Sequence, residues 1–125
     1  MLGKPKILIS EHLDLLCQRC CESFGADCEV VTVERCTDKV ITAIKEHLPQ
    51  IALLETDDSL CDAVEIINHV RKCNDDKLPV FILITHSFRE ECRVRAVSPD
   101  YIFLKPIDWV YMANRIHKES IPQIV

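Results

Sequence analysis

Short runs of apolar residues alternate along the chain with longer segments in which apolar residues recur every three or four positions. The runs are rich in β-branched residues and indicate buried strands, whereas the spaced segments indicate amphipathic helices. The pattern predicts five strands, at residues 6–10, 28–33, 51–55, 79–85 and 101–104. It also predicts five helices, at about residues 13–24, 37–47, 59–72, 88–97 and 109–118.

Polar and helix-breaking residues mark the ends of these elements. Gly25 follows the first predicted helix, where glycine is favoured because it adopts a left-handed backbone without strain, and Pro49 ends the second helix. Short polar side chains accept hydrogen bonds from the first amides of a helix and are therefore favoured as N-caps. The N-caps that the sequence predicts are Thr37, then Asp58 or Ser59, and finally Asp108.

Apolar strands that alternate with helices indicate a parallel sheet covered by helices on both faces. The predicted fold class is therefore α/β, a three-layer sandwich around a five-stranded sheet. Its fourth helix presents only a narrow apolar stripe, formed by Phe88, Cys92 and Ala96. The 125 residues suit a single domain and contain no internal repeat. We expect this domain to span residues 1–119, with 120–125 as a tail or the start of a linker.

Composition narrows the range of functions. The chain is 48% hydrophobic and 28% charged, which is a globular balance. Its net charge of −5 argues against direct binding to nucleic acid, which depends on clustered Lys and Arg. No apolar run approaches the roughly 20 residues that a membrane span needs, and none near the first residues has the length of a secretory signal. We therefore expect a cytoplasmic protein.

Eight cysteines invite a metal or disulfide interpretation. Cys17 and Cys20 have the spacing of half a zinc site, but no second such pair follows and the five histidines are scattered. Both also lie on the apolar stripe of the first predicted helix. Because reduced cysteine is a small hydrophobe, we expect most of the eight in the core and Cys21 exposed. We expect no metal site.

Residues with useful chemistry cluster at the predicted carboxyl ends of the strands. Ligands of open parallel α/β sheets collect at this edge, because the loops diverge there. The residues expected at the edge are Ser10, Glu11, His12, Glu55, Thr85, His86 and Lys105.

The Lys105-Pro106 step after an apolar strand, with Glu55 ending another strand fifty residues earlier, resembles the receiver (CheY-like) domains of bacterial response regulators. The resemblance extends over nearly the whole chain and implies a flavodoxin-like sheet of order 2-1-3-4-5. In that family an acidic pair after strand one holds Mg²⁺, and an aspartate after strand three accepts a phosphoryl group. A Thr or Ser hydroxyl and a Lys that precedes a proline contact the phosphoryl oxygens, and Thr85, Lys105 and Pro106 match these positions.

Three residues depart from the family's phosphorylation site. Glu55 stands where the resemblance places the acceptor aspartate, and its extra methylene moves the carboxylate by about one bond length, which can cost about 10²-fold in rate. Glu11 and His12 stand in place of the acidic pair, and imidazole is a poor ligand for Mg²⁺. We therefore expect a degenerate phosphorylation site with no phosphotransfer and no cofactor.

Two interpretations of Glu55 stay open. Its longer carboxylate can reach Thr85 and Lys105 and imitate a phosphorylated aspartate, or it can form an ordinary ion pair in a relic site. Asp57 and Asp58 are conceivable substitute acceptors, although carboxylates at such loop positions more often cap helices. Ile102 occupies the family's switch position, which usually holds an aromatic residue, and this favours a static module.

Enzymatic activity is not expected. No nucleophile is placed by sequence with His12 or His86, and the two glycines exclude a glycine-rich phosphate loop. Binding to another protein is then the remaining function that we expect. If Val110, Ala113 and Ile116 form the core stripe of the last helix, its large residues Trp109, Tyr111 and Met112 stay partly exposed as an interface. Alternatively, Trp109 folds back over the sheet edge.

The sequence thus predicts an atypical, phosphorylation-independent receiver of a two-component phosphorelay, which acts in signal transduction and transcription regulation. We expect a homodimer through the face of helix four, strand five and helix five, or contact with a protein partner or a C-terminal output domain. The alternative is the receiver-like wing of an inducible amino-acid decarboxylase, which serves oligomer assembly. Leu78-Pro-Val-Phe81 and Thr85-His86-Ser87 resemble that wing, whereas Lys105-Pro106 favours the receiver.

Overall fold

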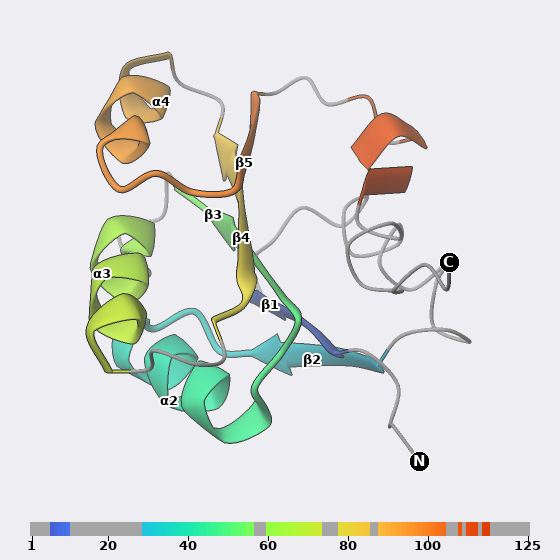
Figure 1. The fold of residues 1–125 in the computed structure, drawn as a ribbon, viewed down its shortest axis with the longest axis vertical. Helices are drawn as coiled ribbons and strands as arrows, with labels where there is room; N and C mark the ends of the chain where they lie inside the picture. The colour runs from blue at the N-terminus through green and yellow to red at the C-terminus, as the bar shows by residue number, and fades with distance from the viewer. Residues whose placement is uncertain are drawn as a thin grey trace.

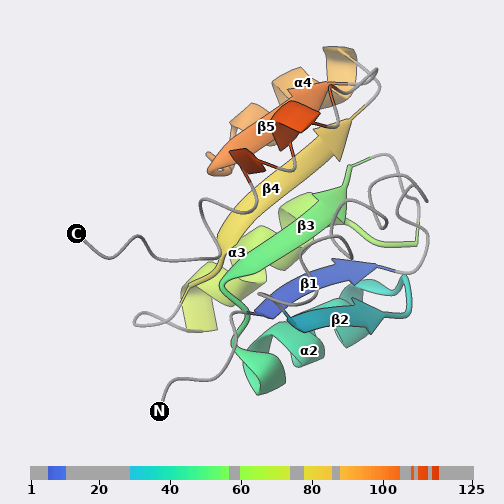
Figure 2. The same ribbon diagram turned by 90° about the vertical axis from the view of Figure 1, so that its right-hand side faces the viewer.

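A single parallel sheet organises the molecule in the computed structural model, which describes residues 6–10, 29–56, 60–73, 78–85, 88–104, 108, 110–112 and 114–115. Its strand order is β2-β1-β3-β4-β5, and Figure 2 shows the five arrows running in one direction. The strands are β1 (Lys6–Ser10), β2 (Glu29–Val33), β3 (Ile51–Glu55), β4 (Val80–Thr85) and β5 (Tyr101–Leu104). The helices are α2 (Thr37–His47), α3 (Ala63–Cys73) and α4 (Phe88–Arg95).

The predicted fold class and strand order are confirmed, and β1, β3 and β5 have the predicted bounds. The first predicted helix, at 13–24, lies outside the described residues, as do Gly25 and the tail at 120–125. Within the last predicted helix, residues 110–112 and 114–115 are helical. None of the helices in the described ranges is both long and apolar enough to cross a membrane.

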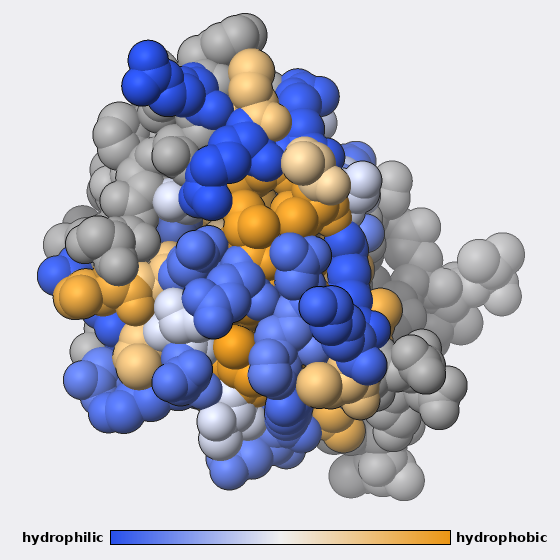
Figure 3. Space-filling view, turned by 90° about the vertical axis from the view of Figure 1, so that its left-hand side faces the viewer, coloured by the Kyte–Doolittle hydropathy of each residue, from blue (hydrophilic) through white to orange (hydrophobic). Residues whose placement is uncertain are grey.

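Strand alternation divides the core into two layers. Leu8, Leu54 and Leu83 join the cluster beneath α2, α3 and α4, whereas Ile9, Leu53 and Ile82 join the cluster on the other face. Figure 1 shows the three helices along one side of the sheet, and Figure 3 shows that their outer surface is largely hydrophilic, with apolar atoms in its middle. Because β1 and β3 are covered on both faces, their sequences are nearly continuous apolar runs.

The starts of α2 and α3 contact each other, and this corrects two predicted caps. Thr37 is the first residue of α2 and not its N-cap; Cys36 is the N-cap and makes no side-chain capping bond. The Thr37 hydroxyl instead accepts a bond from the Asp62 amide at 3.0 Å. Asp62 caps α3, since its Oδ1 accepts bonds from the amides of Val64 at 3.0 Å and Glu65 at 3.2 Å.

The expected start of this helix near residue 59 was therefore a few residues early, and Asp58 and Ser59 lie outside the described residues. Sequence alone did not reveal that Thr37 would be used by a different helix. Its hydroxyl is a suitable cap chemically, but the tertiary contact with Asp62 competes for it.

Helix α4 is held at its end by α3. The Arg71 guanidinium donates to the carbonyls of Val97 and, at 2.8 Å, Ser98, and lies 5.7 Å from the centroid of the Phe81 ring. Val94 is the fully buried residue of α4. The predicted stripe of this helix was wrong at two positions, because Cys92 and Ala96 are exposed. The helix ends at Arg95, so the following turn does not continue its helical face.

The cysteine prediction holds only in part. Cys61 is buried in the core, Cys36 is half-buried, and Cys73 and Cys92 are exposed, so the expected burial was wrong for these last two. Both lie on helices packed against only one side of the sheet, which leaves room for exposed positions. The other four cysteines, including Cys21, fall outside the described residues.

The last helix is rotated relative to the prediction. Its cap is as expected, because Asp108 Oδ1 accepts a bond from the Tyr111 amide at 3.0 Å. Met112, however, is fully buried against the isoleucines of the central strands, and Val110 is 73% exposed. Met112 is therefore a core residue and not an interface residue. Its long flexible side chain fills the layer beneath the sheet, a role to which methionine is suited.

We predict that Asp62→Ala lowers the free energy of unfolding by about 1 kcal/mol, because the first amides of α3 lose their acceptor. Asp62→Asn, which retains the acceptor oxygen, should stay within about 0.5 kcal/mol of the wild type. Urea denaturation followed by circular dichroism measures both changes. Equal losses for the two variants would contradict the capping role and indicate that the charge of Asp62 matters instead.

Candidate functional site

The carboxyl ends of the strands bring the predicted chemical residues to one edge. Ser10 ends β1, Glu55 ends β3 and Thr85 ends β4. Glu55 pairs in register with Ile84, and Thr85 pairs with Leu104 at the end of β5. The three ends therefore lie on the same edge of the sheet, at the arrowheads in Figure 2. This is where open parallel sheets carry their functional groups.

The same edge holds the buried polar residues of the described part of the chain, namely Ser10, Thr56 and Thr85. Everywhere else in these ranges, where the structure describes the burial, the buried side chains are apolar or cysteine, with Pro49 and Pro79 among the apolar ones. A buried hydroxyl costs free energy unless it is hydrogen-bonded, so polar residues do not gather in a core without a reason. Their concentration around half-buried Glu55 makes the edge the best candidate for a site.

Thr56 is a member of this edge that the sequence analysis missed. Its amide donates to the carbonyl of Ile84 at 2.9 Å, which extends the β3–β4 ladder by one residue and sets Thr56 beside Thr85. Its hydroxyl is buried and has no hydrogen-bond partner among the described residues. A polar residue directly after a strand that ends in a carboxylate was the available signal.

Ile102, at the expected switch position, is an integral part of the packing. It pairs with Leu83 of β4 and lies half-buried against the cluster beneath α2, α3 and α4. Tyr101 and Phe103 belong to the opposite face, as strand alternation predicted. Thr85 follows Leu83 by two residues and so shares the face of Ile102. On β5, the side chains that share the face of Thr85 are therefore aliphatic.

Several predicted site residues lie outside the described residues: Glu11, His12, Asp57, Asp58, His86, Lys105, Pro106 and Trp109. Of the described groups at the edge, Glu55 is the carboxylate, and Ser10, Thr56 and Thr85 add neutral hydroxyls. Mg²⁺ prefers several carboxylate or carbonyl oxygens, so this donor set fits it poorly. The described part of the chain contains no group of three or more His, Cys, Asp or Glu side chains that could hold a metal ion.

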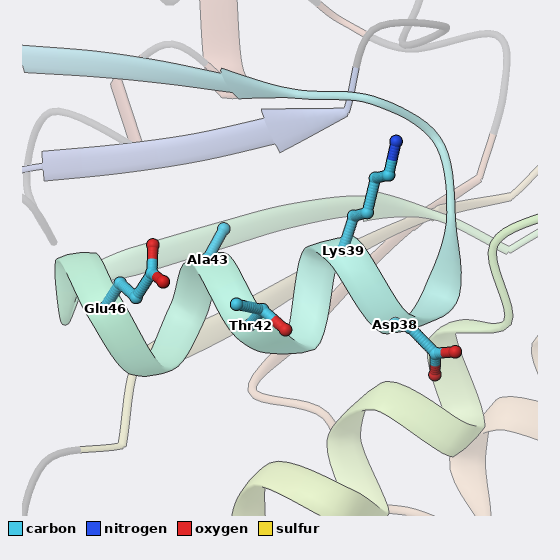
Figure 4. Close-up of a pocket in the computed structure, with 5 residues that line it drawn as sticks. All are labelled: Asp38, Lys39, Thr42, Ala43 and Glu46. Carbon is cyan, nitrogen blue, oxygen red and sulfur yellow. The ribbon is translucent and has the colours of Figure 1, made fainter.

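A hollow of about 230 Å³ lies on α2, away from this edge. Figure 4 shows Lys39, Ala43 and Glu46 rising from one side of the helix, as their spacing of one and two turns requires, with Asp38 and Thr42 pointing elsewhere. Every lining residue that the structure describes comes from this helix. Since no second element among the described residues contributes a group, the hollow gives no support for a site there.

A row of aromatic rings follows β5, the outermost strand of the described sheet. The rings of Tyr101 and Phe103 stack with centroids 6.5 Å apart, and Tyr111 meets Phe103 edge-on at 6.0 Å. The Arg115 guanidinium lies 4.5 Å from the centroid of the Tyr101 ring. Tyr111 is 55% exposed and Val110 is exposed as well, whereas exposed Leu104 belongs to the face of Ile102 by strand alternation. We call Val110 and Tyr111, with the row beneath them, the β5 surface.

Solved structures share this fold. The chain is similar to a response regulator receiver domain from Bermanella marisrubri, with 16% identity and a TM-score of 0.77 over 94% of this chain and 98% of that chain. It is similar to a CheY-like receiver domain from Methanospirillum hungatei JF-1, with 14% identity and a TM-score of 0.74 over 93% of both chains.

A third similar structure is a DNA-binding response regulator of the LuxR family from Staphylococcus aureus, with 16% identity and a TM-score of 0.74 over 94% of this chain and 99% of that chain. No family model matches the sequence, and no curated protein matches it. At these identities the likeness establishes the fold, which is that of CheY-like receiver domains.

We predict that Thr56→Val leaves the protein as stable as the wild type or raises the free energy of unfolding by about 1 kcal/mol. The substitution removes a buried hydroxyl that lacks a partner and keeps the shape of the side chain. Thr42→Val, on the exposed side of α2, is the matched control and should change stability by less than about 0.5 kcal/mol. A loss of more than about 1 kcal/mol for Thr56→Val in urea denaturation would show that the hydroxyl is bonded in solution.

Proposed function

We propose that this chain is a receiver-type signalling domain of the response-regulator class that works without phosphorylation. One observation carries the proposal. In a sheet of the receiver fold, β3 ends in Glu55, where the family resemblance calls for an acceptor aspartate. The domain therefore keeps the architecture of a phosphorelay component and lacks the side chain on which the switch depends.

The chemistry of the edge supports this proposal. A carboxylate displaced by about one bond length is poorly aligned for attack on a phosphoryl group, and such misplacement can cost about 10²-fold in rate. The described edge offers Mg²⁺ a weak donor set, and the sequence places a histidine next to Glu11 after β1. Because both metal binding and nucleophile position are impaired, phosphotransfer and enzymatic activity are not part of the proposed function.

The packing of Ile102 supports a static module. A switch residue in a receiver must move between two positions, and an aromatic ring usually does so. Ile102 is a branched aliphatic side chain, half-buried in the cluster that includes Leu83 and Val94. Whether Glu55 imitates a phosphorylated aspartate or forms an ordinary ion pair, the output does not depend on an incoming phosphoryl group.

We propose that the output is contact with a second copy of this chain through the β5 surface. Tyrosine is enriched among the residues that carry most of the binding energy at interfaces, and exposed Val110 would add apolar area beside Tyr111. The family resemblance implies dimerisation through the face of helix four, strand five and helix five.

Transcription regulation fits this role only indirectly. One similar structure is a DNA-binding response regulator. The net charge of −5 disfavours nucleic-acid contact by this chain, so in a regulator of that class the DNA-binding function would belong to an output domain. In the proposed scheme, the domain works in the cytoplasm and sets the dimeric state on which such an output depends.

We predict that acetyl phosphate with Mg²⁺ adds no stoichiometric phosphoryl group to the protein, as measured by intact mass. A receiver with an acceptor aspartate, treated in parallel, is the positive control. A gain of one phosphoryl group per chain that disappears in Glu55→Gln would reject the proposal. A gain that persists in Glu55→Gln would also reject it and would direct attention to Asp57 and Asp58.

We predict that Tyr111→Ala and Val110→Ser each weaken self-association by at least about tenfold in sedimentation equilibrium, because truncation of an interface anchor typically costs about 2 kcal/mol. Leu48→Ser is the matched control, since Leu48 is 41% exposed but lies at the end of α2. Glu55→Gln should also leave association unchanged. If self-association is unaffected by Tyr111→Ala and Val110→Ser but is abolished by Glu55→Gln, the β5 surface is rejected as the interface.

A further inference from the structure

The start of α2 and the segment before α3 are joined by two hydrogen bonds that converge on one residue. The Thr37 amide donates to the Leu60 carbonyl at 3.2 Å, and the Thr37 hydroxyl accepts from the Asp62 amide at 3.0 Å. Cys61 is therefore flanked on both sides by bonds to Thr37. Cys36 immediately precedes Thr37, so the fold brings together two cysteines that are far apart in the sequence.

The connectivity brings the two cysteine α-carbons close together. Cys36 supplies the carbonyl carbon bonded to the Thr37 nitrogen, and Cys61 follows the Leu60 carbonyl that accepts the bond. In trans peptides the α-carbon of Cys36 lies on the N–H side of its peptide unit and that of Cys61 on the C=O side, so a bond of 3.2 Å holds the two α-carbons roughly 4–7 Å apart. That separation overlaps the range of about 4.4–6.8 Å that a disulfide spans.

The burial of the neighbouring residues is compatible with this juxtaposition. The amide of Val40, in the first turn of α2, donates to the carbonyl of the extended N-cap residue Cys36 at 2.9 Å. Val40 is fully buried and is in the same core cluster as Cys61, which is 2% exposed. Cys36 is half-buried and so remains open to solvent reagents.

We propose that Cys36 and Cys61 form a redox-sensitive thiol pair whose disulfide joins the start of α2 to the start of α3. A cysteine at an N-cap that makes no capping bond is otherwise a poor choice, because Ser, Thr, Asn or Asp there would stabilise the helix. A disulfide partner at Cys61 would explain why a cysteine stands at this N-cap. This inference does not rest on the proposed function.

The reaction is thiol–disulfide exchange with a small-molecule disulfide such as oxidised glutathione. The Cys36 thiolate attacks one sulfur of the reagent, whose S–S bond breaks and releases one glutathione. The Cys61 thiolate then attacks the Cys36 sulfur of the mixed disulfide and expels the second glutathione. The two protons lost by the cysteines end on the released thiols, so the protein is oxidised by two electrons and the reagent is reduced by two.

The link would act next to the candidate site. Residues 56–62 connect the end of β3, with Glu55, to the N-cap of α3. Asp62, the residue after Cys61, also lies 4.0 Å from the Arg93 guanidinium of α4. Oxidation would therefore restrain the segment that joins the sheet edge to two of the covering helices, and reduction would release it.

Non-reducing tryptic mapping tests the pair on the whole chain in glutathione redox buffers. Trypsin releases Cys36 in peptide 36–39 and Cys61 in peptide 46–71, each with no other cysteine, while Cys73 and Cys92 fall in peptides 73–77 and 90–93. We expect the 36–39 and 46–71 peptides to be linked, at least about tenfold more often than either is linked to Cys73 or Cys92, because the fold raises their effective concentration. Cys36→Ser should abolish the link, and Cys73→Ser should not.

Hydrogen exchange supplies a second readout that does not require a variant of buried Cys61. Oxidation should slow exchange of the amides at residues 60–65 in the wild type and in Cys73→Ser, but not in Cys36→Ser. Separate glutathione adducts on the two peptides, or preferred links to Cys73 or Cys92, would overturn the proposal. Exchange that slows equally in Cys36→Ser would overturn it as well.

Discussion

The burial of β3 between β1 and β4 is the constraint on which the rest of the structure depends. Its residues Ile51 to Leu54 are almost completely removed from solvent, and they alternate between the two core layers. Each large side chain buried in this way contributes about 1.5–3 kcal/mol. A shift of the strand by one residue would exchange its two faces, so the packing fixes the register and therefore where the strand ends. Glu55 stands at the edge because Leu54 and Leu53 cannot leave the core.

The same constraint explains why the polar chemistry of the described chain gathers at one edge. Strands that are buried along their whole length can place polar groups only where they emerge, and parallel strands all emerge with their carboxyl ends together. Ser10, Thr56 and Thr85 occupy these positions. In the proposed function, this edge is a fixed part of the frame. The proposed output therefore lies along β5, where Tyr111 and Phe103 form an aromatic surface next to the edge.

Contacts between helix ends connect the edge to the covering layer. Thr37 of α2 bonds to both neighbours of Cys61, and Asp62 both caps α3 and lies near Arg93 of α4. Arg71, near the end of α3, bonds to the segment that follows α4. Helix α3 is thus restrained at its start by α2 and α4 and at its end by the segment after α4. A covalent link between Cys36 and Cys61 would add a further restraint to this layer of α2, α3 and α4.

The sequence by itself determined the five strands, their parallel order through the resemblance to receivers, and the edge position of Glu55 and Thr85. The strands follow from unbroken apolar runs, which depend on neighbours close in the chain, whereas the strand order is what the resemblance implied. Tertiary structure decided which way the last helix faces, so that Met112 is buried and Val110 is exposed. It also decided that Thr37 bonds to Leu60 and Asp62, the two residues that flank Cys61. Such choices depend on which distant surface a side chain meets, and no local spacing encodes that partner.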